Sequence, residues 1–143
     1  MSTYVDTSVL LTTLIAEPAT EAVYDSLGAE GQELLVSDFA AAEVASALSR
    51  LVRMALLSDA DASARLADFD AWRAAMSLPV DIAASDARLA HIYARRFDLG
   101  LRAPDALHLA IARRLDATLI TLDRRLATAA REMGITVEVP KAS

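Results

Sequence analysis

The sequence contains no cysteine, which excludes disulfide bonds and thiolate metal sites. It also lacks any run of about 18 uninterrupted apolar residues, the length expected for a transmembrane helix. Only Met1 and Ser2 precede the first strand-like segment, which leaves no room for a signal peptide. These absences predict a soluble, cytoplasmic protein that makes no membrane contact.

Aromatic residues are scarce, at 5% of the chain, although apolar residues make up 55%. A core of closely packed aliphatic side chains and alanines is therefore expected. A chain of 143 residues is long enough for one such core and too short for two domains of ordinary size. We therefore expect a single domain over residues 1–143.

Lysine is almost absent, because Lys141 is the only one among 14 basic residues and the others are arginines. The formal net charge of −6 argues against a wide basic surface for long duplexes, but it leaves a short single strand possible. Arginines occur as neighbours at 95–96, 113–114 and 124–125. Most are expected on solvated helix faces, and a minority to hold phosphates bidentately.

Short apolar segments alternate with helical patterns along the whole chain. Strands are expected at residues 3–5, 34–36, 79–82, 118–121 and 136–139, and helices at 7–17, 20–27, 38–55, 59–76, 85–97, 104–115 and 123–132. Strands separated by helices of this length predict an α/β fold. The expected fold is a central parallel sheet of four to five strands, flanked by helices on both faces and joined by right-handed crossovers.

Acidic residues follow two of these strands directly. Asp6 and Asp123 each end a strand and open a helix, so parallel strands would bring both carboxylates to the same edge of the sheet. The lengths of the helix and strand between them place Asp105 at the same edge as Asp123. The helix from Asp105 to Leu115 descends about 16 Å, and the strand that follows climbs back a similar distance at about 3.3 Å per residue.

Glu43 lies early in the helix after the second strand, at the same edge, as a lone acid between Ala42 and Val44. Four carboxylates in one cleft repel each other unless a cation compensates them. All-oxygen ligation favours Mg²⁺ or Mn²⁺ over zinc. Such a metal assists phosphodiester hydrolysis, which is the chemistry we expect.

Helix capping is the competing explanation, because aspartate is a favoured residue at helix starts. Taken alone, Asp6, Asp105 and Asp123 each fit a capping role, and Glu43 alone fits a solvated helix face. The coincidence of all four at one edge favours the metal site.

Polar neighbours of the acids are candidates for supporting roles. The hydroxyls of Ser8 and Thr121 are placed to orient a carboxylate or a metal-bound water, although Ser8 also suits ordinary capping. His108 lies one helical turn after Asp105, and we interpret it as a partly buried helical histidine instead of a ligand or general acid. No role is assigned to His91.

The ordered set of these segments resembles the PIN domain, and its length resembles that of the stand-alone bacterial PIN proteins called VapC toxins. The similarity covers essentially the whole chain. It rests on four segments: Tyr4 to Ser8, the isolated Glu43, Pro104 to Ala110, and Leu119 to Asp123.

The resemblance implies a Mg²⁺- or Mn²⁺-dependent endoribonuclease that cuts single-stranded or looped RNA. It also implies that the acidic cluster consists of Asp6, Glu43, Asp105 and Asp123, which act as catalytic residues and metal ligands. A homodimer or a toxin–antitoxin hetero-oligomer is implied as well, inhibited by a small VapB-type antitoxin that obstructs the acidic cleft.

Other functions remain open at this point. A PIN-fold RNA-processing nuclease without an antitoxin shares the same residues, and a Mg²⁺-binding signalling or interaction module shares the fold class. A receiver-type module needs a lysine after a late strand, and Lys141 lies beyond the last one. A haloacid-dehalogenase-like phosphatase needs a second aspartate where Ser8 stands.

Overall fold

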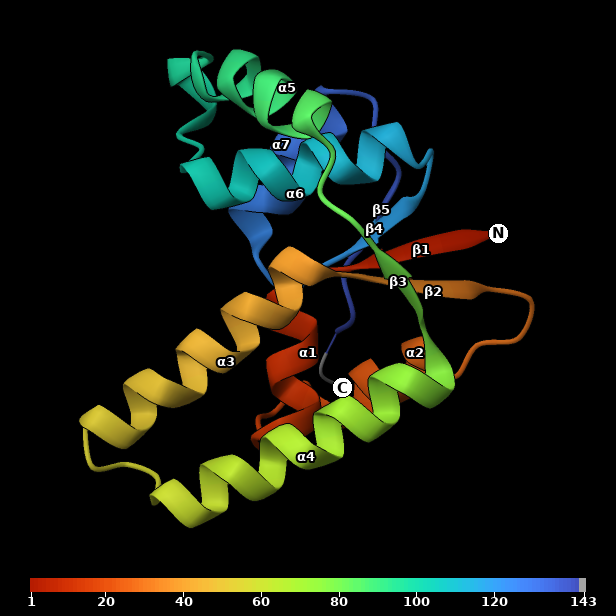
Figure 1. Ribbon diagram of the computed structural model, residues 1–143. Helices are drawn as coiled ribbons and strands as arrows, with labels where there is room; N and C mark the ends of the chain where they lie inside the picture. Colours follow the sequence, from red (N-terminus) through yellow and green to blue (C-terminus); the bar gives the residue numbers. More distant parts are fainter. Residues whose placement is uncertain (142–143) are drawn as a thin grey trace.

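The computed structural model describes residues 1–141, whose strands form one parallel sheet in the order β3-β2-β1-β4-β5 (Figure 1). The strands are β1 (Ser2–Val5), β2 (Glu33–Ser37), β3 (Leu78–Val80), β4 (Thr118–Ile120) and β5 (Val137–Glu138). The helices are α1 (Thr7–Leu14), α2 (Thr20–Leu27), α3 (Asp38–Arg53), α4 (Asp59–Met76), α5 (Ala84–Ala94), α6 (Ala103–Arg114) and α7 (Arg124–Glu132), with a 3₁₀ turn, η1 (Phe97–Leu99). The predicted α/β fold is confirmed. Residues 142 and 143 of the expected domain lie outside the described residues.

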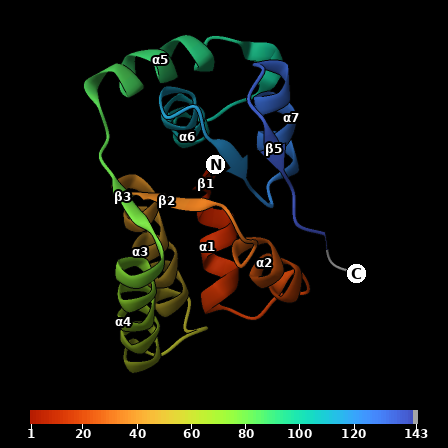
Figure 2. The same cartoon turned by 90° about the vertical axis from the view of Figure 1, so that its right-hand side faces the viewer.

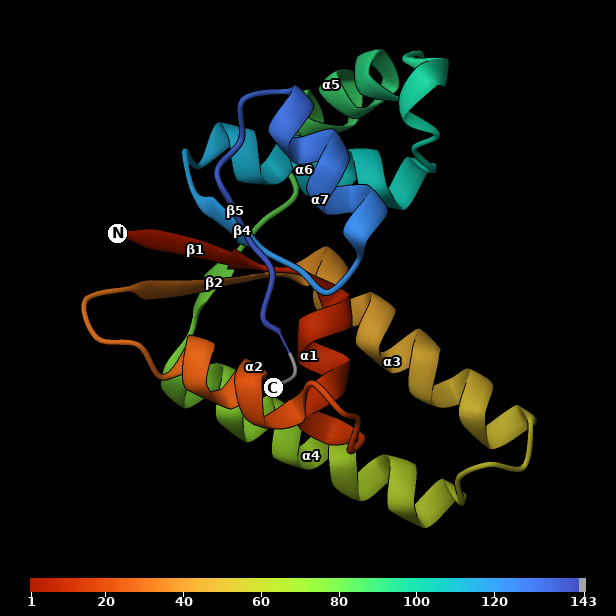
Figure 3. The ribbon, with the colours of Figure 1, turned by 180° about the vertical axis from the view of Figure 1, so that it is seen from behind.

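Helices cover both faces of the sheet. Helices α5, α6 and α7 lie on one side, and α1 to α4 lie on the other (Figures 1 and 2). Figure 3, seen from behind, again shows α7 with α6 on one side and α1 with α2 on the other. No helix within residues 1–141 combines the length and the apolar character needed to cross a membrane.

The central strands supply side chains to two separate cores, because successive residues of a strand face opposite sides. Tyr4 and Leu119 belong to the core beneath α6 and α7, together with Leu109 and Leu126. The other core lies against α1 to α4 and is built from the alternate strand residues. Its buried members are Val5, Val9, Leu10, Val23, Leu27, Leu34, Val36, Ala40, Val44, Phe69 and Ile120.

Local capping explains where several helices begin and end. Ser37 accepts a hydrogen bond from the Ala40 N–H at 3.0 Å at the start of α3, and Ser58 caps α4 in the same way. Gly134 takes a left-handed conformation (φ 75°) just after α7, as a helix-terminating glycine does. These starts and this stop agree with the boundaries expected from the sequence.

The prediction of one helix over residues 85–97 is wrong at its end. Helix α5 ends at Ala94, and the chain continues through the 3₁₀ turn to Gly100, which has a φ of 61°. A longer helix would bury little, because Phe97 is 89% exposed. The minor strand expected at 79–82 lies slightly earlier, at Leu78–Val80, and the last strand is shorter than expected.

An ion pair between a buried aspartate and a partly exposed arginine fastens α5 to α6. Asp86 is 1% exposed and accepts two hydrogen bonds from the Arg114 guanidinium, at 2.8 and 2.9 Å. Its Oδ2 also accepts the Ala83 N–H at the start of α5. Because a buried carboxylate is costly unless it is paired and hydrogen-bonded, these contacts fix how α5 packs on α6.

Candidate active site

Asp6 is an almost fully buried carboxylate at the carboxyl end of β1. The residue is 5% exposed, and its N–H donates to Ile120 O at 3.0 Å, which holds it beside the end of β4. Its Oδ2 accepts hydrogen bonds from the hydroxyls of Ser8 at 2.6 Å and Thr121 at 2.8 Å. The side chain makes no capping bond to α1, so capping does not account for Asp6.

Glu43 reaches the same place from α3. Its Oε1 accepts hydrogen bonds from Thr7 Oγ1 at 2.7 Å and from His108 Nε2 at 2.5 Å. Burial opposes its ionisation, but the hydrogen bonds from His108 and Thr7 outweigh that effect and lower the pKa of Glu43 below its usual value. Glu43 is therefore an ionised group of this site and does not lie on a solvated helix face.

His108 lies between the two carboxylates. Its Nε2 is 2.5 Å from Glu43 Oε1 and 3.7 Å from Asp6 Oδ1, and its Nδ1 is 2.6 Å from the Tyr4 hydroxyl. The residue is 2% exposed, which is more complete burial than the sequence suggested. Its spacing from Asp105 was the one available signal, whereas nothing in the sequence pointed to Tyr4, which is 104 positions away.

Asp123 and Asp105 have capping contacts. Asp123 Oδ1 accepts from the N–H groups of Arg125 and Leu126, at 3.0 and 3.1 Å. Its own N–H donates to Thr121 Oγ1 at 3.0 Å, and this hydroxyl connects it to Asp6. Asp105 Oδ2 accepts from the Arg102 N–H at 3.1 Å. Asp105 is one turn before His108, about 4.5 Å along the helix axis.

The structure therefore groups the four predicted acids unequally. Asp6 and Glu43 share one imidazole, Asp123 joins Asp6 through Thr121, and no hydrogen bond or ion pair among residues 1–141 connects Asp105 to the other three. All four carboxylates are hydrogen-bonded in the same way. One carboxylate oxygen of each is engaged by the protein, and the second has no hydrogen-bond partner within the described part of the chain.

The donor set fits a hard divalent cation. Asp6 and Glu43 flank the same imidazole and each keeps one open oxygen, and Mg²⁺ is usually held by one or two carboxylates with water completing its shell. Over residues 1–141, no three histidine or acidic side chains converge as a ready-made metal site. Asp6 and Glu43 are thus the residues best placed to hold such an ion.

A groove between α1 and α3 is lined in part by Glu43. Its volume is about 580 Å³. Thr7 and Glu43 line one part of it, and Arg50 and Arg53 lie two to three helical turns further along α3. Positive side chains therefore line the same groove as the ionised Glu43.

The PIN-domain family model matches residues 3–132 of the sequence. The chain belongs to the PIN-domain family. The match spans all of the site residues, from Asp6 in β1 to Asp123 before α7. A comparison with curated proteins finds no match.

Solved structures share this PIN fold at low sequence identity. VapBC2 from Rickettsia felis, bound to a DNA fragment from its promoter, aligns with a TM-score of 0.75 and 14% identity, over 99% of this chain and 100% of the other. VapC20 from Mycobacterium tuberculosis, a toxin that cleaves the sarcin-ricin loop, aligns with a TM-score of 0.69 and 17% identity, over 89% and 94%. A toxin–antitoxin complex from Klebsiella pneumoniae aligns with a TM-score of 0.69 and 19% identity, over 99% of both chains. At these identities the likeness shows the fold alone.

The two hydroxyls on Asp6 lead to a prediction about stability. Thr121→Val keeps the shape of the side chain but removes the donor to Asp6 Oδ2, so we expect the free energy of unfolding to fall by roughly 1–3 kcal/mol. Thr128→Val is the matched control, since Thr128 is exposed on α7 and donates only to the Arg124 carbonyl. Urea unfolding of the three proteins measures both effects. Equal stabilities of Thr121→Val and wild type would show that Asp6 does not depend on this bond.

Proposed function

We propose that this PIN-domain protein is a divalent-metal-dependent endoribonuclease and the toxin of a VapBC-type toxin–antitoxin pair. The observation that carries the proposal is the pair formed by Asp6 and Glu43. Each carboxylate is fixed by hydrogen bonds through one oxygen and keeps the other open, at the carboxyl edge of the sheet where α/β folds bind their ligands.

Mg²⁺ or Mn²⁺ is the cofactor that this donor set favours. In the proposal Asp6 and Glu43 are its main ligands, and Asp105 and Asp123 complete the acidic cluster through their open oxygens. The ion would supply charge neutralisation at the phosphate and a more acidic water. Ser8 and Thr121 hold Asp6, and Thr7 and His108 hold Glu43, so that the two carboxylates keep their spacing without the ion.

RNA is the proposed substrate because two arginines line the groove beside Glu43, together with one further acid, Glu17. Arg50 and Arg53 are placed to contact phosphates on one side of the scissile bond. A short single strand or loop needs few such contacts, which is compatible with a net charge of −6. The proposed site of action is the cytoplasm, where cellular RNA is translated.

An antitoxin partner is supported by the structural neighbours, several of which are toxin–antitoxin complexes. We propose that a small VapB-type protein binds this chain and obstructs the acidic cleft, and that the toxin forms a homodimer within the complex. The acidic surface of the toxin suits a partner that carries positive charge.

The proposed activity is tested by RNA cleavage with Mg²⁺ or Mn²⁺ and with EDTA. We expect cleavage that requires the ion and leaves 5′-phosphate ends, because hydrolysis by water leaves them, whereas attack by the 2′-hydroxyl leaves a cyclic phosphate. Glu43→Gln should lower turnover at least about ten-fold with an unchanged far-UV spectrum, while Glu30→Gln, at an exposed loop residue, should not. Full cleavage in EDTA would exclude the metal-dependent mechanism.

Asp105→Asn separates metal binding from capping, since the asparagine oxygen can accept the Arg102 N–H as the carboxylate does but carries no charge. If Asp105 belongs to the acidic cluster, the variant should be at least as stable as wild type in EDTA, because like-charge repulsion is relieved. Wild type should then gain stability with Mg²⁺, by about 2.7 kcal/mol at a hundred-fold excess over Kd, and the variant much less. Thermal melts measure this, and equal Mg²⁺-induced gains would leave Asp105 as a cap only.

The partner is tested by expressing this chain with the product of any short reading frame immediately upstream. Growth arrest on induction should be relieved by the partner, the two proteins should co-purify, and light scattering should give a mass above one copy of each. Arrest that persists although the partner is bound would contradict the inhibitory role.

A further inference from the structure

A buried chain of hydrogen bonds leads to Glu43 from the interior of the protein. It consists of Ser37, Tyr4, His108 and Glu43, and we call it the Tyr4–His108 chain. The Tyr4 hydroxyl is 2.8 Å from Ser37 Oγ and 2.6 Å from His108 Nδ1, and His108 Nε2 is 2.5 Å from Glu43 Oε1. Ser37, Tyr4 and His108 are at most 2% exposed, so water does not compete for these bonds.

The direction of donation along the chain follows from counting protons. An ionised carboxylate such as Glu43 only accepts hydrogen bonds, so Nε2 of His108 carries the proton in that bond. The Tyr4 hydroxyl has one proton for two partners, and donation to Nδ1 at 2.6 Å, the shorter of the two contacts, leaves Ser37 as the donor to the Tyr4 oxygen. Ser37 Oγ already accepts the Ala40 N–H, which leaves its own proton for the Tyr4 oxygen. In this arrangement each of the three hydrogen bonds has one donor and one acceptor.

Aromatic packing fixes the orientation of the His108 imidazole. The Tyr4 and Phe39 rings lie 5.7 and 5.2 Å from the His108 ring, centroid to centroid, and both are tilted relative to it. Rotation of the imidazole would break hydrogen bonds at both of its nitrogens. The N–H at Nε2 is therefore held between Glu43 and Asp6, whose Oδ1 is 3.7 Å away.

We propose that His108 is a positioning residue that holds Glu43 beside Asp6, and that Tyr4 orients it by fixing its tautomer. The exposure of Glu43, the last residue of the Tyr4–His108 chain, argues for this role over simple packing. The Glu43 side chain is 29% exposed and could be hydrated at little cost, so the fold does not need three buried polar groups to satisfy it. The expected effect on catalysis rests on the proposed function, whereas the tautomer does not.

The tautomer is tested by ¹⁵N NMR of the metal-free protein at pH 8. The chain has two histidines, so exposed His91 serves as an internal control. We expect His108 to show a protonated Nε2 and an acceptor Nδ1, and His91 to show a solvent-averaged mixture of tautomers. In Tyr4→Phe the Nδ1 signal of His108 should shift strongly while His91 stays unchanged. A protonated Nδ1 in wild type, or an unchanged His108 spectrum in Tyr4→Phe, would overturn the proposal.

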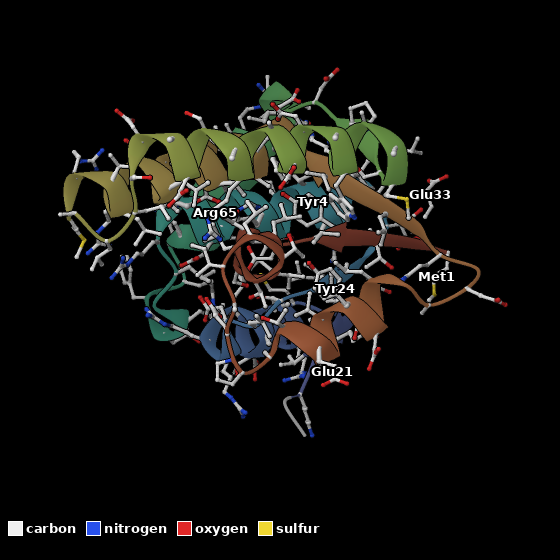
Figure 4. The ribbon with its side chains drawn as sticks, turned by 90° about the horizontal axis from the view of Figure 1, so that it is seen from below. Met1, Tyr4, Glu21, Tyr24, Glu33 and Arg65 are labelled. Carbon is white, nitrogen blue, oxygen red and sulfur yellow. The ribbon has the colours of Figure 1, made fainter. Side chains whose placement is uncertain are left out.

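Tyr24→Phe is a matched control for the kinetic test. Figure 4 labels Tyr4 on β1 and Tyr24 on α2; Tyr4 is fully buried, whereas Tyr24 is 52% exposed and its hydroxyl donates to the Thr13 carbonyl. Tyr4→Phe should lower kcat for RNA cleavage about ten- to a hundred-fold with little change in KM, because it disturbs Glu43 and leaves Arg50 and Arg53 of the groove in place. Tyr24→Phe should leave both constants unchanged.

Two substitutions of His108 separate loss of the hydrogen bond to Glu43 from loss of packing. His108→Gln keeps an N–H donor for Glu43, whereas His108→Leu has a similar volume and no donor, so the glutamine variant should retain the higher kcat. Equal kcat values in folded forms of the two variants, or a wild-type kcat in Tyr4→Phe, would refute the positioning role and leave the nuclease proposal intact. Wild type that shows the expected tautomer but cleaves no RNA would instead refute the nuclease proposal and leave the hydrogen-bond chain in place.

Discussion

The burial of the Asp6 carboxylate is the constraint on which the rest of the site depends. A carboxylate that is 5% exposed is tolerated only if its oxygens are satisfied, and here two hydroxyls satisfy one of them. One hydroxyl comes from Ser8 in the following helix and the other from Thr121 after β4. The bond from Thr121 requires β1 and β4 to be parallel with Val5 opposite Ile120, the register that the sheet has.

The same two hydroxyls also organise the turn after β4. Ser8 Oγ accepts the Leu122 N–H at 3.0 Å, and Thr121 Oγ1 accepts the Asp123 N–H at the same distance. The start of α7, and with it Asp123, is therefore fixed relative to Asp6. A polar requirement at one buried group thus determines the path of the chain where the candidate site lies.

The site forms where the two helical layers meet at the edge of the sheet. Helix α6 lies over one face and brings His108, while α3 lies over the other and brings Glu43, so their hydrogen bond crosses the end of the sheet. Because neither layer contains the pair alone, the arrangement depends on both cores being formed. The placement of the acids in this PIN domain therefore depends on the stability of both cores.

The sequence by itself determined the elements and the residues placed next to them. Its periodicity, the caps at Ser37 and Ser58 and the stop at Gly134 are local signals, and Asp6 and Asp123 could be assigned to strand ends because each adjoins a strand in the chain. Local signals did not fix the end of α5, which depends on how much a longer helix would bury against α6.

Only the tertiary structure decided which groups meet. It separated Asp6, which caps no helix, from Asp105 and Asp123, which do form capping contacts, although all three occupy similar positions in the sequence. It also brought Tyr4 to His108 across 104 positions. The sequence around a tyrosine in a buried strand does not indicate which helical histidine it will contact, because their contact is set by the packing of the sheet against α6.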